Sequence, residues 1–173
     1  MFHRYFILPL VLCVLAGCKQ ESITEEQKNI RAELEKLGVE VMGNELLSVN
    51  LQGSEEITSE LLKKIASYGK ISYINFQDSN VTDECLKSLQ GAEGVETIFL
   101  NQTDVTDEGL SHLADMSDLI ILHLPQSITD AGFETVGQFT ALKTLVADGC
   151  QVTDKGMASL ENLSELRWLK INN

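Results

Sequence analysis

A pattern with a period of about 24 residues runs along most of this chain and constrains its fold more than any other feature. Its most visible mark is a recurrent Thr-Asp pair. The pairs begin at Thr82, Thr106, Thr129 and Thr153, and Thr58-Ser59 is a degenerate first copy. Successive Thr residues are 24, 24, 23 and 24 positions apart. Self-similarity at such a period is typical of a solenoid, in which each unit stacks on its neighbours.

A short apolar frame of the form L-x-x-L-x-L precedes each of these Thr residues and occurs once more after the last. The six copies are Leu46/Val49/Leu51, Ile71/Ile74/Phe76, Val95/Ile98/Leu100, Leu119/Leu122/Leu124, Leu142/Leu145/Ala147 and Leu166/Leu169/Ile171. The last two apolar positions of a frame are two residues apart, which places both on one face of a short strand. The sequence therefore predicts one strand per repeat.

A short helix is predicted in the second half of each repeat. Thr stands where a helix N-cap belongs, and Asp follows at the first helical position, facing the positive end of the helix dipole. Apolar residues spaced i, i+3 then give each helix one buried stripe. These stripes are Leu86/Leu89, Leu110/Leu113, Phe133/Val136 and Met157/Leu160. A unit of this kind cannot bury its apolar edge alone, so it must stack.

The segments 105–110 and 128–133 resemble the [IV]-T-D-x-G-L signature of leucine-rich repeats, and they are closest to the cysteine-containing subclass. Cys150 occupies the Asn/Cys position of that consensus. The resemblance covers residues 46–173. It implies a right-handed α/β solenoid with short parallel strands on a concave face and short helices on a convex face. The sequence departs from the signature at Leu61 and Cys85, which replace Gly, and in the lengths of the first turn and the Pro125 turn.

The N-terminus is predicted to be an export signal over residues 1–17. Arg4 precedes a run of ten apolar residues, which is too short to span ~30 Å of hydrocarbon as a helix. The ending Leu-Ala-Gly-Cys at 15–18 resembles the lipobox of bacterial lipoproteins. That resemblance implies cleavage before Cys18, acylation of its thiol and a membrane anchor, with residues 18–22 as a tether. Lys19, by the same resemblance, favours the outer membrane or the periplasmic face as the location.

Residues 23–45 are predicted to cap the first repeat. Ile23, Ile30, Leu34 and Leu37 have helical spacing, and Gly38 is placed to end the helix. Val39–Met42 then alternates like a strand. A solenoid needs its end covered, and this helix and strand stand where an N-terminal cap belongs.

The charge balance argues against two classes of partner. Loss of residues 1–17 removes one base, Arg4, from the 13 in the chain, which leaves 12 bases against 26 acids and a net charge of −14. Nucleic acids and anionic lipid headgroups are bound by clustered Lys and Arg, so neither is expected as a partner.

No catalytic or metal-binding set is expected. The chain has no nucleophile elbow, phosphate loop, zinc pair or calcium loop, and no cofactor is predicted. Cys85 and His112 fall in neighbouring repeats, but a half-buried thiol and a solvated imidazole on helical segments are the ordinary interpretation. Helix capping explains the repeated Thr-Asp pairs better than metal ligation does. The chain is therefore predicted not to be an enzyme.

The predicted concave face carries large side chains at positions that flank the buried residues of each strand. They are Tyr73, Phe99, Ile121, His123, Val146 and Trp168. Aromatic groups at this density suggest a contact surface for a protein or peptide. The alternative is strand propensity, which favours the same residue types on any sheet.

The sequence thus favours a lipid-anchored envelope module that binds a protein or peptide on its concave face. A structural envelope component without a specific ligand, or an enzyme subunit, are the alternatives. The last frame, at 166–171, has no following helix to cover its strand edge. Natural proteins protect such edges, so a two-fold pair of chains meeting through this strand is also predicted.

Overall fold

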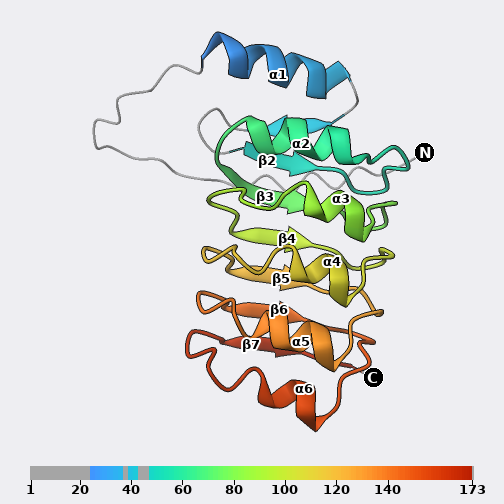
Figure 1. The fold of residues 1–173 in the computed structure, drawn as a ribbon, viewed down its shortest axis with the longest axis vertical. Helices are drawn as coiled ribbons and strands as arrows, with labels where there is room; N and C mark the ends of the chain where they lie inside the picture. Colours follow the sequence, from blue (N-terminus) through green and yellow to red (C-terminus); the bar gives the residue numbers. More distant parts are fainter. Residues whose placement is uncertain (1–23, 37–38, 43–46, 173) are drawn as a thin grey trace, which may run out of the picture.

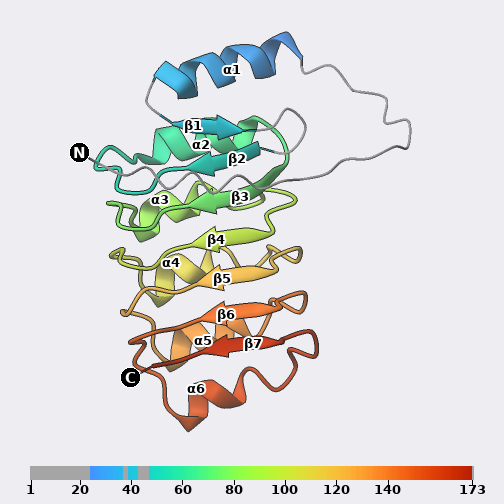
Figure 2. The same cartoon turned by 180° about the vertical axis from the view of Figure 1, so that it is seen from behind.

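The computed structural model describes residues 24–36, 39–42 and 47–172 and forms an α/β solenoid. Seven strands make one sheet in the order β1-β2-β3-β4-β5-β6-β7, and the helices of the repeats line one of its faces (Figures 1 and 2). The strands are β1 Glu40–Met42, β2 Leu47–Asn50, β3 Ile71–Asn75, β4 Thr97–Phe99, β5 Ile121–His123, β6 Thr144–Val146 and β7 Trp168–Lys170. The helices are α1 Glu25–Lys36, α2 Ser59–Ser67, α3 Asp83–Lys87, α4 Asp107–Ser111, α5 Asp130–Val136 and α6 Asp154–Ala158. This architecture confirms the α/β solenoid of stacked repeats that the sequence predicts.

Strands β2 to β7 are parallel, and from β3 onward each residue pairs with its counterpart one repeat later. Thr97 pairs with Ile121, Ile121 with Thr144, and Thr144 with Trp168. A second periodic bond lies just after each strand, where the last apolar residue of a frame donates its N–H to a carbonyl of the next strand. The donors are Leu51, Phe76, Leu100, Leu124 and Ala147, at N···O distances of 2.8–2.9 Å.

The core lies between the sheet and the helices. Ile98 and Leu122 from the sheet and Leu110 and Phe133 from the helices are fully buried. The other described residues of the first five frames are buried as well, as the spacing predicts. Leu46 lies outside the described residues. The sixth frame differs, because Leu169 is 42% exposed and no further repeat covers it in the described chain.

Helix α1 and strand β1 form the N-terminal end of the stack, where Figures 1 and 2 show α1 lying beyond β1. Thr24 and Gln27 start α1 as a capping box, with the Gln27 N–H donating to Thr24 Oγ1 (3.1 Å) and the Thr24 N–H donating to Gln27 Oε1 (2.9 Å). Leu34 is fully buried, and β1 pairs antiparallel with β2. The expected helix and strand are therefore present. Ile23, Leu37 and Gly38, which the sequence assigns to that helix and its end, lie outside the described residues.

None of the helices in the described part of the chain is long and apolar enough to cross a membrane. The predicted export signal and Cys18 lie outside the described residues, so lipid anchoring stays a prediction.

Candidate partner-binding surface

Three rings form one cluster on the open sheet face, which is the face opposite the helices and the one that the sequence predicts to be concave. Tyr73 on β3 meets Phe99 on β4 edge to face, with ring centroids 5.5 Å apart and planes at 84°. Phe99 stacks on His123 of β5 with centroids 4.2 Å apart and an interplanar angle of 32°. All three side chains are half-buried, because each covers part of its neighbour. This aromatic cluster follows directly from the strand register, since Phe99 pairs with His123.

The aromatic cluster carries no formal charge near neutral pH. Burial lowers the pKa of His123, the cation of Lys170 lowers it further, and the anion of Asp148 partly opposes this. Burial raises the pKa of Tyr73, with a hydrogen bond to Asn75 acting in the opposite direction. The surface is therefore an uncharged aromatic area on a strongly acidic protein.

The other three predicted contact residues lie on the same sheet and make no ring contact with the cluster. Ile121 is the strand partner of Thr97, and Val146 is the strand partner of His123. The side chains of Ile121 and Val146 are half-buried. Trp168 stands on β7 with 62% of its surface exposed. The structure thus groups three of the six predicted residues tightly and leaves Trp168 as a separate exposed ring at the end of the sheet. Whether any of the six binds a partner stays a prediction.

Polar side chains border the aromatic cluster on both sides. Asn75 donates to Gln52 (3.4 Å) and accepts from the Gln77 N–H (2.9 Å). Beyond His123, Lys170 forms an ion pair with Asp148, which also accepts from Asn172 (2.8 Å). An apolar centre with a polar border is the usual anatomy of a protein–protein contact.

The helical side shows no catalytic arrangement in the described residues. Cys85 is buried and its thiol is directed to the Ile57 carbonyl at 3.8 Å, while His112 is the C-cap of α4. No hydrogen bond joins these two side chains in the described structure. Within the same described ranges, no group of three or more His, Cys, Asp or Glu residues is arranged to hold a metal ion.

The Thr residues of the repeats cap helices, with one exception. Thr106, Thr129 and Thr153 each accept a backbone N–H two residues later at 3.2–3.3 Å, and Thr58 accepts the Leu61 N–H at 3.1 Å. Thr82 is the N-cap residue of α3, as predicted, but its side chain makes no capping hydrogen bond. Its hydroxyl instead donates to the thiol of Cys85 at 3.4 Å, a residue that only this repeat has at that position.

The Asp residues have a role that the sequence analysis missed: each joins two consecutive repeats. Asp83 accepts from the N–H (2.8 Å) and the hydroxyl (2.7 Å) of Thr106 in the next repeat. Asp107 binds Thr129 in the same way (2.9 and 2.6 Å). Asp130 likewise binds Thr153 (2.8 and 2.7 Å). We call this arrangement the Asp–Thr joint.

Glycine three residues after each of these Thr residues makes room for the Asp–Thr joint. A Cβ on Gly109, Gly132 or Gly156 would overlap the carboxylate of Asp83, Asp107 or Asp130, respectively. The Gly of the [IV]-T-D-x-G-L pattern therefore leaves room for the Asp of the preceding repeat, and at Gly132 and Gly156 also for the side chains of Ile128 and Val152.

The first repeats confirm this dependence. Ser59 replaces Asp in the first copy, and Cys85 stands at the Gly position of the next repeat, where no carboxylate needs room. Leu61 fills the Gly position of the first copy, which has no repeat before it. The sequence alone could have indicated the Asp–Thr joint, because the copy that lacks Asp is followed directly by a copy that lacks Gly.

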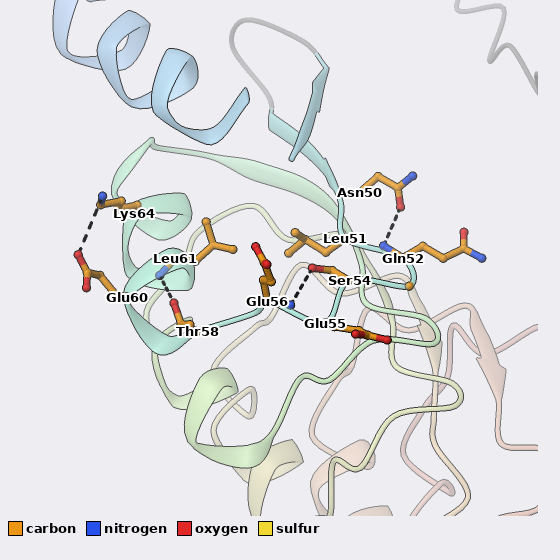
Figure 3. A pocket seen from close by; sticks show the side chains of 11 residues that line it. Asn50, Leu51, Gln52, Ser54, Glu55, Glu56, Thr58, Glu60, Leu61 and Lys64 are labelled. Carbon is orange, nitrogen blue, oxygen red and sulfur yellow. Dashed lines mark hydrogen bonds and ion pairs between the residues drawn. The ribbon is translucent and has the colours of Figure 1, made fainter. Parts of the chain in front are cut away.

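An open groove of about 850 Å³ lies at the turn of the first repeat, where the sequence has one extra residue (Figure 3). Glu55, Glu56 and Glu60 line it, together with Lys64. Lys64 forms ion pairs with Glu33 (3.2 Å) and Glu60 (4.0 Å). The groove is thus acidic and stands apart from the aromatic cluster.

No family model matches the chain, and no curated protein matches it. Among solved structures, an internalin (inlF) from Listeria monocytogenes is similar at 15% sequence identity and a TM-score of 0.25, over 93% of this chain and 72% of that chain. The parallel strands and short helices of the described residues are those of a repeat α/β solenoid.

Proposed function

We propose that this chain is a lipid-anchored module of the bacterial cell envelope that docks a protein or peptide on its open sheet face. The observation that carries the proposal is the aromatic cluster of Tyr73, Phe99 and His123 on three adjacent strands. Aromatic side chains supply much of the binding energy at protein interfaces, especially where a polar border surrounds them.

The partner's chemistry follows from this surface and from the charge of the chain. The cluster is uncharged near neutral pH, and a body with 26 acids repels anionic polymers. An apolar or aromatic side chain of a polypeptide fits the cluster, and the side chains of Gln52 and Gln77 lie next to Asn75 at its polar border. These features favour a protein or peptide over a nucleic acid.

The envelope location is proposed from the lipobox-like ending at 15–18 and its acceptor, Cys18. Two or more acyl chains hold a protein stably on a membrane. In Cys18→Ser cells, we expect the protein to leave the membrane fraction and to retain its unprocessed mass. Normal processing and membrane retention of this variant would contradict the anchor.

The binding role is tested by Phe99→Ser, which removes the central ring of the cluster. A matched control is His112→Ser, which removes a half-buried ring from the helical side. After crosslinking in the cells that produce the protein, Phe99→Ser should lose a specific adduct that His112→Ser retains. Circular dichroism must show that both variants are folded. An unchanged adduct pattern in Phe99→Ser would contradict the proposal.

A structural component without a specific ligand is the second candidate. The observation that favours it is that Phe99 already packs against rings on both sides, which shields part of its surface without a partner. Under that function, Phe99→Ser would lower stability and leave every adduct in place.

A further inference from the structure

His123 lies on β5 within the aromatic cluster, at a place that any occupant of the cluster would touch. Its imidazole stacks on Phe99 of β4, with ring centroids 4.2 Å apart and an interplanar angle of 32°. On the other side, its strand partner is Val146 of β6, whose side chain is half-buried. A side chain of a partner that is seated on Phe99 therefore also covers part of the His123 ring.

His123 is the member of the cluster whose charge can change between pH 5 and 8. Along strands β3 to β7, the titratable residues are Tyr73, His123 and Lys170. Tyr73 is neutral in this range, and burial raises its pKa further. A single proton on His123 therefore converts the cluster from an uncharged surface to a cationic one.

The charged side chains that act on His123 in the described part of the chain lie on its β6–β7 side. Lys170 of β7 forms an ion pair with Asp148, which follows β6. Burial is the main cause that lowers the pKa of His123, the Lys170 cation lowers it further, and the Asp148 anion partly opposes this. The imidazole is therefore neutral at pH 7, and an added proton would lie in a half-buried ring stack near a second cation.

A partner that covers the aromatic cluster removes more water from His123. Loss of water disfavours the charged imidazolium, so the pKa of His123 is lower in the complex than in the free protein. By linkage, the affinity is at its maximum above the pKa of the free protein and falls as the pH drops through that value. A decrease of one unit in this pKa on docking makes the complex about tenfold weaker in acid.

We infer that the protonation state of His123 regulates docking on the open sheet face, so that a polypeptide partner binds at neutral pH and is released in mild acid. The partner covers the rings with an apolar or aromatic side chain and presents no carboxylate to His123. A carboxylate there would pair with the imidazolium and strengthen binding in acid, which is the opposite dependence. This regulation rests on the proposed docking function, but the titration that it requires is a property of the free protein.

The titration is tested by NMR of the imidazole protons in the full chain in detergent, with the His123 signals assigned by their loss in His123→Phe. We expect a midpoint for His123 below its ordinary 6.5. Lys170→Gln should move this midpoint to higher pH because it removes a cation, and Asp148→Asn should move it to lower pH because it removes an anion. A midpoint of 6.5 or above in the unmodified chain, or movement in the opposite directions, would overturn the inference.

The regulation is tested by photo-crosslinking in permeabilised cells that produce the protein. A photoreactive residue replaces Thr97, the strand partner of Tyr73, and the yield of its protein adduct is compared at pH 7.5 and pH 5. We expect the yield to fall by up to about tenfold at pH 5. In His123→Phe, which has a ring that cannot be protonated, the ratio of the two yields should be close to one. His112→Phe, on the helical side, is the matched control and should keep the dependence on pH.

Circular dichroism at pH 5 must show that each protein is folded. Equal yields at both values of pH, a higher yield at pH 5, or the same fall in His123→Phe would overturn the regulation but not the docking function. The absence of an adduct at both values of pH would contradict the docking function itself, and the regulation with it.

Discussion

Replacing both members of one Asp–Thr joint should cost much less than the sum of the two single replacements. Asp83 accepts two hydrogen bonds from Thr106, at 2.8 and 2.7 Å. At about 1 kcal/mol for each bond, Asp83→Ser should lower the free energy of unfolding by about 2 kcal/mol. Gly109→Ala displaces the same carboxylate, but alanine recovers up to ~1 kcal/mol of helix propensity, so its net loss should be about 1–2 kcal/mol.

With Asp83→Ser in place, the carboxylate that Gly109→Ala would displace is absent. The double variant should therefore lose about 1–2 kcal/mol in total, which gives a coupling free energy of about 2 kcal/mol between the two positions. The chain itself contains such a pair, because Ser59 replaces the Asp of the first copy and Cys85 replaces the Gly of the next. Urea unfolding of the four proteins measures the coupling. Glu108→Ser, an exposed acid beside Gly109, serves as the control and should add independently to Gly109→Ala. Additive losses in the Asp83 pair would refute the reasoning.

Three further predictions concern single sites. Thr106→Ala should lower the free energy of unfolding by about 1–2 kcal/mol, because it removes a helix cap and one hydrogen bond of an Asp–Thr joint. Thr82→Ala should lower it by less, because Thr82 makes no capping hydrogen bond. Hydrogen bonds from the Thr153 N–H and hydroxyl lower the pKa of Asp130 in the folded protein below its ordinary 3.8. The ionised Asp130 therefore stabilises the fold fully above pH 3.8, and this stabilisation is lost as the pH falls through the folded pKa. Asp130→Asn should make the free energy of unfolding less dependent on pH when chemical unfolding is measured from pH 5 to 2. Burial, with the nearby anions of Asp107 and Asp148, raises the pKa of Cys150 to about 11, so iodoacetamide at pH 8 should label it only after unfolding.

Much of the fold could be predicted because each repeat records its own local structure. The frame around Leu122 predicts a strand, and the stripe of Leu110 and Leu113 predicts a helix. The same periodicity predicts which of these side chains are buried. The strand register follows from the frames, so Phe99 and His123, which take the same position in consecutive frames, lie side by side on the open face. What periodicity could not predict is how side chains from different repeats interact.

The missed features all depend on contacts between repeats. The sequence predicts that Asp107 interacts with the dipole of its own helix, whereas its carboxylate accepts hydrogen bonds from Thr129 of the next repeat. Thr82 looked like its equivalents, yet the neighbouring Cys85 takes its hydroxyl. The ring contacts of Phe99 also depend on side-chain packing across strands, which the sequence pattern does not specify.

The most direct test of the proposed function is site-specific photo-crosslinking in the cells that produce the protein. A photoreactive residue in place of Thr97 would lie on the open sheet face between the strand neighbours Tyr73 and Ile121. One in place of Glu108 would lie on the helical side, on exposed α4. We expect a discrete protein adduct from position 97 that disappears in the Phe99→Ser background, and none of that mass from position 108. Equal adducts from both positions, or no adduct from position 97, would contradict binding through the open sheet face.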